Sequence, residues 1–333
     1  MTRVSRTKIF AAIAALLVSM VWGLSFVVVK DVVELLPPLS FIAARYVVAV
    51  AVILPICWRR LRRQDWRRML GAAFQVGAPL GAAQALQVIG AQHTTASNSA
   101  LITGLYIVLV PLVGLAFGQA VTKRQMGIAL LAFAGLALFT LDAELRVAAG
   151  DWWVLGAAVC FAIHFNMLGR WGARYDALTL TGMQLTAAML LLVPAALLLA
   201  PIPSPGLFLT GPVLWPILFC GILVTVVGFG VQTAVQRVLP PAPSAILFSS
   251  ESLFGALSGV VFHQDPFLPR QILGAVILLG SMVGSVLGEQ KTPPSATPAP
   301  SAAPAPSAAP APSAAPAMSA APDRPDTPDC CGQ

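Results

Sequence analysis

The sequence predicts an all-α membrane protein, with ten transmembrane helices arranged as two inverted five-helix repeats. Of the 333 residues, 57% are hydrophobic and only 10% are charged, whereas soluble domains carry roughly 25% charged residues. About ten apolar segments have the roughly 20-residue length that crosses the hydrocarbon core of a bilayer. The first half of the chain also resembles the second half.

The apolar segments are expected to be helices, because irregular backbone in lipid would leave amide groups without hydrogen-bond partners. The sequence lacks the strand-like alternation of apolar and polar residues that would indicate a β-barrel. The expected spans are residues 9–29, 38–58, 69–90, 97–118, 125–141, 152–169, 178–200, 213–236, 243–262 and 271–288.

The internal repeat is visible in two pairs of segments. Residues 39–45 lead into an apolar stretch that ends at Pro55, and residues 178–184 lead into one that ends at Pro194, an offset of 139 residues (Pro55 to Pro194). Residues 122–127 resemble residues 268–274 with a one-residue slip. Because each repeat has an odd number of spans, the second enters the membrane upside down. This architecture is typical of alternating-access transporters.

The placement of basic residues independently predicts the orientation. With the N-terminus inside, sixteen Lys and Arg residues fall on the cytoplasmic side and three fall outside, with Arg45 within a span. By the positive-inside rule, both termini are cytoplasmic. The basic residues behind the net charge of +7 are therefore expected to set the membrane orientation and to contact anionic lipid. Nucleic acid is not an expected partner.

The predicted organisation has four parts. Residues 1–141 form the first repeat (spans 1–5), residues 142–150 an external linker, and residues 151–290 the second repeat (spans 6–10). Residues 291–333 repeat Pro, Ala and Ser and predict a disordered cytoplasmic tail, because this composition buries too little apolar surface to fold.

Motifs of soluble enzymes are missing from the sequence. It has no Gly-rich phosphate loop ending in Gly-Lys-Ser/Thr, and its three histidines are too scattered for a metal pair at helical spacing. We therefore expect no catalytic residues, no metal and no cofactor.

Two charged residues lie inside predicted spans. Glu251 lies on the order of 12 Å from the inner end of the ninth span, at 1.5 Å per residue. An ionised carboxylate there costs about 2.5–3.5 kcal/mol, so it should face a cavity, be paired or be protonated. It could bind a substrate cation, couple transport to protons, or cap groups such as Ser249 and Ser250.

Arg45 lies roughly 10 Å from the outer end of the second span. It could snorkel outward, contact an anion, or pair with Glu251. In the repeat alignment Gln184 takes the place of Arg45, and Leu105 that of Glu251. The predicted site is therefore chemically asymmetric on a symmetric scaffold.

Neutral polar residues inside the spans predict a polar-lined central cavity, although any single one could simply join two helices by a hydrogen bond. Trp22, in the middle of the first span, could stack on an apolar substrate or only pack. The candidate substrate-binding or coupling residues are Trp22, Arg45, Gln84, Gln87, Asn98, Asn166, Gln184, Gln232 and Glu251.

These motifs resemble the drug/metabolite transporter superfamily, specifically EamA-type exporters with ten spans. The resemblance rests on residues 22–26, on Phe41 and Arg45, on residues 95–100 with Pro111, and on residues 243–252 followed by Gln271 and Gly274. It covers about residues 9–288. Ser252, Gln119 and Asp265 depart from the family pattern. These departures concern the ion pairs at the external and internal gates of such transporters and not the fold.

The resemblance implies a secondary transporter that exports a small metabolite, amino acid or drug-like compound across the bacterial inner membrane. Proton coupling and facilitated exchange are both compatible with the sequence, and oligomeric state is left open. The alternatives are a membrane-embedded lipid-handling protein, flippase or enzyme, and a scaffold that acts through the proline-rich tail.

Overall fold

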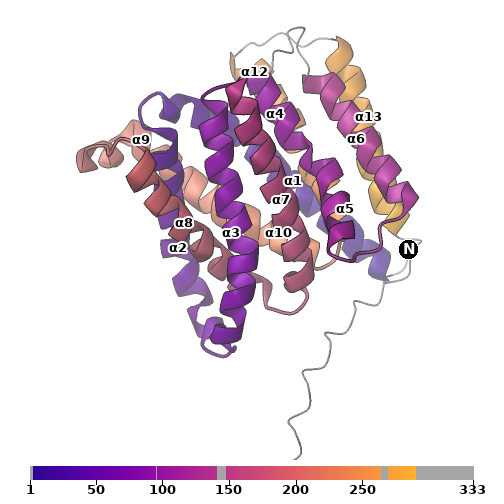
Figure 1. Ribbon diagram of the computed structural model, residues 1–333, viewed down its shortest axis with the longest axis horizontal. Coiled ribbons are helices and arrows are strands. Elements are labelled where there is room, and N and C mark those ends of the chain that lie inside the picture. The colour runs from indigo at the N-terminus through magenta and orange to yellow at the C-terminus, as the bar shows by residue number, and fades with distance from the viewer. Residues whose placement is uncertain (1–2, 95, 141–147, 264–268, 290–333) are drawn as a thin grey trace, which may run out of the picture. The chain divides into compact units, whose positions relative to one another are not determined.

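The computed structural model describes residues 3–94, 96–140, 148–263 and 269–289, and these residues form helices and connecting turns without any strand (Figure 1). The predicted tail lies outside the described residues. The helices are α1 (Arg3–Val33), α2 (Pro38–Leu61), α3 (Trp66–Ala91), α4 (Ala96–Gly104), α5 (Tyr106–Ala116), α6 (Lys123–Thr140), α7 (Ala149–Gly172), α8 (Ala177–Leu199), the 3₁₀-helix η1 (Pro205–Leu209), α9 (Gly211–Phe219), the π-helix η2 (Cys220–Val227), α10 (Gly228–Gln236), α11 (Pro241–Phe248), α12 (Glu251–His263) and α13 (Pro269–Glu289).

Six of the described helical segments are long and apolar enough to cross a membrane. They are Arg6–Val33, Pro38–Leu61, Ala149–Gly172, Ala177–Leu199, Gly211–Gln236 and Pro269–Gly288, and a shorter apolar segment spans Leu101–Ala116. The prediction of a multi-pass helical membrane protein is confirmed. The count of ten spans stays a prediction.

The outward-facing side chains fit a lipid environment. Leu198 is 82% exposed, and Leu199 and Trp152 are exposed to similar extents. In water such side chains would favour aggregation, whereas in a bilayer they contact acyl chains. The buried apolar residues form two main clusters, one around α1, α5, α6, α11 and α13 and one around α2, α8, α9 and η2.

Local sequence explains where the helices begin. Pro38 occupies the first turn of α2, where its missing N–H is not needed. Asp65 caps α3 by accepting from the Arg68 N–H, and Asp176 caps α8 by accepting from the Thr179 N–H. At α7, the Asp151 carboxylate accepts from the Ala148 N–H at 2.9 Å.

The main helix packing joins residues before 141 to residues after 148. The most extensive contacts are those of α3 with α7 and α8, of α2 with α8, of α6 with α13 and of α1 with α12; Figure 1 shows α6 beside α13. Glycines permit several of these approaches. A β-carbon at Gly77 of α3 would lie 2.2 Å from the Gln184 carbonyl oxygen of α8, and one at Gly23 would lie 2.6 Å from the Gly255 nitrogen.

Two of the predicted spans, residues 97–118 and 243–262, are interrupted along their length. The first break is at Leu105, between α4 and α5, and the second is at Ser249 and Ser250, between α11 and α12. The Ser249 hydroxyl donates to the Ile246 carbonyl at 2.8 Å, and the Ser250 hydroxyl donates to the Leu247 carbonyl at 2.7 Å. These bonds provide hydrogen-bond partners for backbone carbonyls at the break, which buried irregular backbone requires.

Candidate functional site

Arg45 and Gln84 are brought together in the interior by α2 and α3. The Arg45 guanidinium donates to Gln84 Oε1 at 2.7 Å, and Arg45 is only 8% exposed. The ion pairs among the described residues are Arg60–Asp176 and Arg68–Asp65. The structure therefore pairs Arg45 with a neutral amide and not with Glu251.

Gln184, the repeat counterpart of Arg45, is completely buried. Its Nε2 donates to the Thr233 hydroxyl of α10 at 2.9 Å, and the Thr181 hydroxyl approaches the same oxygen at 3.1 Å. Gln184 Oε1 has no hydrogen-bond partner among the described residues. On α3, Gln87 Nε2 donates to the Thr103 hydroxyl of α4 at 3.2 Å.

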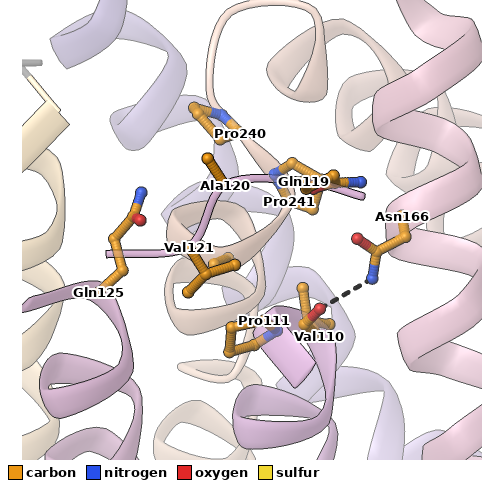
Figure 2. Close-up of a pocket in the computed structure, with 10 residues that line it drawn as sticks. Val110, Pro111, Gln119, Ala120, Val121, Gln125, Asn166, Pro240 and Pro241 are labelled. Atoms are coloured by element: carbon orange, nitrogen blue, oxygen red, sulfur yellow. Dashed lines mark hydrogen bonds between the residues drawn. The ribbon is translucent and has the colours of Figure 1, made fainter. Parts of the chain in front are cut away.

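Asn166 of α7 faces a small cavity beside the turn that joins α5 to α6 (Figure 2). Its Nδ2 donates to the Val110 carbonyl at 2.9 Å and the Ala162 carbonyl at 2.8 Å. These bonds fix the amide, and Oδ1 has no partner within the described part of the chain. A β-carbon at Gly114 would lie 3.1 Å from this oxygen and 3.2 Å from Gln119 Oε1, so two acceptors converge there.

The cavity volume is about 40 Å³. This holds a few water molecules and is far smaller than the roughly 300–1,000 Å³ of a ligand pocket. The lining residues are Val110, Pro111, Gln119, Ala120, Val121, Gln125, Asn166, Pro240, Pro241 and Ala242. It is a small crevice at the end of the bundle where α6 and α11 begin.

Gln232 of α10 and His164 of α7 form a second buried polar region. His164 Nδ1 lies 3.0 Å from the Val76 carbonyl, and the ring packs edge-on against Phe229 at a centroid distance of 6.2 Å. His164 Nε2 and Gln232 Oε1 lack partners of ordinary geometry among the described residues. No group of three or more His, Cys, Asp or Glu residues that could hold a metal occurs in the described ranges.

Trp22 of α1 is held by the π-helix η2. Its Nε1 donates to the Val224 carbonyl at 2.9 Å, and its ring packs on Phe229 and Phe248 at centroid distances of 5.4 and 5.3 Å. π-Helical turns inside α-helices often occur at functional sites. Gly228 is necessary for this contact, since a β-carbon there would lie 2.3 Å from Trp22 Nε1.

Glu251 is the first residue of α12, directly after the break that follows α11. Its side chain is half-buried, and it forms none of the ion pairs of the described residues. The hydroxyls of Ser249 and Ser250 bond backward to carbonyls and not to this carboxylate.

The hydrogen bonds of the predicted residues are pairwise contacts. Arg45 and Gln84 are direct partners, whereas Gln87, Asn166, Gln184 and Trp22 each bind other groups. The side chain of Asn98 lies outside the described residues. Their roles toward a substrate stay a prediction.

Three polar residues next to the predicted ones were missed. Tyr46, Thr103 and Thr233 are buried, and the two threonines accept from predicted glutamines. Spacing alone gives part of this signal, because Thr181 and Gln184 share a helical face. Thr233 lies on another helix, and sequence spacing does not reveal its partner.

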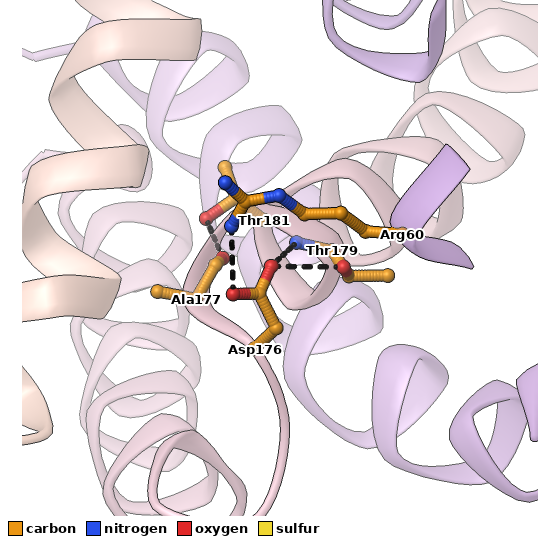
Figure 3. Close-up of polar contacts among 5 residues, drawn as sticks. All are labelled: Arg60, Asp176, Ala177, Thr179 and Thr181. Carbon is orange, nitrogen blue, oxygen red and sulfur yellow. Dashed lines mark hydrogen bonds and ion pairs between the residues drawn. The ribbon is translucent and has the colours of Figure 1, made fainter. Parts of the chain in front are cut away.

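An ion pair joins the end of α2 to the beginning of α8 (Figure 3). Arg60 of α2 and Asp176 of α8 lie 3.1 Å apart. Partial burial alone would raise the pKa of Asp176, but hydrogen bonds from the Thr179 hydroxyl and N–H and the charge of Arg60 outweigh it, and the pKa lies below its usual value. The carboxylate is therefore ionised at neutral pH.

Known proteins resemble this chain along most of its length. Two relatives from Archaeoglobus fulgidus are each described as an uncharacterized transporter. The first is 25% identical over 277 residues, which is 83% of this chain and 85% of the relative. The second is 24% identical over 201 residues, 58% of this chain and 68% of the relative.

One solved structure, whose description reads only "Crystal structure of protein", has the same fold as this chain. It has a TM-score of 0.69 and 15% sequence identity, and the match covers 86% of this chain and 99% of the other. The sequence model of the EamA-like transporter family matches twice, at residues 9–141 and 148–287. Together with the transporter relatives, this match identifies a membrane transporter and not an enzyme. The chain belongs to the EamA-like transporter family.

Proposed function

We propose that this protein is a secondary transporter that exports a small metabolite, amino acid or drug-like compound by alternating access. It works in the bacterial inner membrane with both termini in the cytoplasm. Two inverted five-helix units, residues 1–141 and 151–290, rock about a central polar cavity, with residues 142–150 as the external linker and residues 291–333 as a cytoplasmic tail.

The observation that carries this proposal is the direction of helices that correspond in the repeat. Helix α2 corresponds to α8, and the end of α2 meets the beginning of α8 through the Arg60–Asp176 ion pair. Helix α6 corresponds to α13: Gly288, near the end of α13, lies against Arg124 at the beginning of α6. Both pairs run antiparallel, as two units of opposite orientation require.

The two helix breaks also support the proposal. Leu105, between α4 and α5, corresponds to Glu251, the first residue after the break between α11 and α12. Discontinuous helices near the bilayer midplane are where secondary transporters place their substrate and ion sites. One break carries a carboxylate and the other carries leucine, so the two units contribute different chemistry to the centre.

Glu251 is the residue proposed to couple flux to protons. The chain has no ATP-binding motif, so uphill transport must use the gradient of an ion or of a second substrate. Protonation of a carboxylate inside the membrane removes its charge and with it a cost of several kcal/mol. A proton can thereby change which conformation is favoured.

The test is flux in proteoliposomes that contain the purified protein. We expect saturable efflux for at least one compound from a panel of amino acids, amines and aromatic drugs, and Glu251→Gln should flatten the dependence of flux on pH. Glu34→Gln is the matched control, because Glu34 is exposed near the end of α1. Unchanged kinetics and an unchanged pH profile in Glu251→Gln would remove Glu251 from the mechanism.

A further inference from the structure

Arg45 presents an unbalanced positive charge inside the protein. The residue is 8% exposed, and its guanidinium donates to one neutral acceptor, Gln84 Oε1. Its Nε has no hydrogen-bond partner among the described residues. A buried charge is normally paired, so this arrangement lacks an anion.

The groups around the guanidinium are also donors. The Arg45 guanidinium carbon lies 5.6 Å from the centroid of the Tyr46 ring. The buried Tyr46 hydroxyl has no partner of ordinary geometry in the described part of the chain, so its proton is available to donate. The Gln84 amide uses its oxygen for Arg45, which leaves its NH₂ group to donate. A guanidinium, a hydroxyl and an amide nitrogen thus lie together without a negatively charged acceptor.

The carboxylates of the described residues are placed elsewhere. Asp65 and Asp176 pair with Arg68 and Arg60, and Asp151 accepts from the Thr94 hydroxyl and the Ala148 N–H at the start of α7. Asp31 and Glu34 are exposed at the end of α1. Glu251 forms no ion pair within the described ranges.

The neighbouring backbone holds Arg45 in place. A β-carbon at Gly221 of the π-helix η2 would lie 2.9 Å from the Arg45 carbonyl oxygen, so η2 packs directly on this turn of α2. Gln84 and Gln87 of α3 are half-buried, so part of the surface of each residue stays accessible. The site is preorganised on α2, α3 and η2.

We propose that Arg45, with the Tyr46 hydroxyl and the Gln84 amide, binds a carboxylate group of the transported substrate. The planar guanidinium matches a carboxylate with two parallel hydrogen bonds. This inference rests on the proposed transport function and narrows its substrate class to compounds that carry a carboxylate. A free inorganic anion such as chloride would satisfy the same charge, and the test separates the two.

The experiment compares each acid with its own primary amide. Proteoliposomes that contain the full-length protein are loaded with phenylalanine or phenylalaninamide, leucine or leucinamide, and nicotinate or nicotinamide. The wild type should export at least one acid about tenfold faster than its amide. Arg45→Gln should reduce this preference to about twofold or less, and Arg45→Lys, which keeps the charge but not the planar fork, should lie between them.

Arg59→Gln is the matched control, because it removes the same charge from an exposed position at the other end of α2. It should keep the wild-type preference. Thermal stabilisation of each purified variant by the same acids and amides gives a second readout, which confirms that Arg45→Gln is folded and shows whether acid binding is lost.

The outcomes are separable. Flux of amides or amines with no preference for acids, or a preference that survives in Arg45→Gln, overturns the carboxylate site and leaves transport intact. Flux that depends on chloride and not on the acid group assigns Arg45 to an inorganic anion and also overturns the inference. No saturable flux of any compound counts against the transport function itself.

Discussion

At the scale of single residues, Asp176 combines a helix cap with an ion pair. Its carboxylate accepts from the Thr179 N–H at 3.1 Å and the Thr179 hydroxyl at 3.0 Å, and it faces Arg60 at 3.1 Å (Figure 3). The same side chain therefore begins α8 and ties it to the end of α2.

Asp176→Asn should keep the cap and lose the charge. The folded-state pKa of Asp176 is lowered, so its ionised form stabilises the fold above the unfolded pKa of about 3.9, and this stabilisation disappears as the pH falls through the folded pKa. Because Arg60 is well exposed, we expect a loss below about 1 kcal/mol at pH 7, measured by thermal unfolding in detergent.

The difference between wild type and Asp176→Asn should shrink when the melts are repeated at about pH 3. Asp65→Asn provides a comparison, because Asp65 caps α3 and pairs with a neighbour on its own helix. A difference between wild type and Asp176→Asn that grows on acidification would contradict this account of Asp176.

At the scale of helices, close packing is set by glycines at particular contacts. A β-carbon at Gly23 would lie 2.6 Å from both the Gly255 nitrogen and the Phe254 β-carbon, and 2.8 Å from the Glu251 carbonyl oxygen. Two of these atoms belong to backbone, which cannot turn aside as a flexible side chain does. The separation of α1 and α12 therefore depends on the absence of a side chain at this residue.

Gly23→Ala should force α1 and α12 apart and cost about 1–3 kcal/mol. We expect a lower unfolding temperature and reduced yield of monodisperse protein. Gly127→Ala is the matched control, since nothing lies within 4 Å of a β-carbon there, and alanine in a helix should be neutral or stabilising by about 0.5–1 kcal/mol. Equal effects of the two changes would refute the close-packing account.

The helices and their approximate ends could be predicted from the sequence, because a bilayer demands long apolar segments with satisfied backbone. The position of Arg45, about seven residues into its helix, was also available from the sequence. Its direct contact with Gln84 was not. Which face of a helix meets protein and which meets lipid is poorly encoded when both surroundings are apolar.

Other features had little sequence signal. The first helix break, at Leu105, does not stand out in a pattern of apolar residues. The second falls in the polar run of residues 249–252, which does not by itself distinguish a break from a polar site on a continuous helix. The bond from Trp22 to the Val224 carbonyl depends on a π-helical turn whose residues, 220–227, resemble any other span. Such local departures from α-helix arise from tertiary packing, which one chain segment does not reveal.

At the scale of the whole molecule, the proposed orientation predicts which loops face each side of the membrane. In a cysteine-free background, single cysteines at Trp152 and Leu209, 69% and 75% exposed, should react with a membrane-impermeant maleimide in intact cells. A cysteine at Arg62 should react only after the cells are opened. Labelling of all three from one side would rule out the inverted arrangement.

The packing of α2 on α8, of α3 on α7 and of α6 on α13 has a consequence for biosynthesis. In each pair, one helix is synthesised early and the other late. The helices of the first half therefore lack their packing partners until the second half has been inserted into the membrane. We therefore expect assembly to be completed late in synthesis and neither half to fold alone. Two fragments divided between residues 141 and 148 should regain the native contacts only when they are produced together.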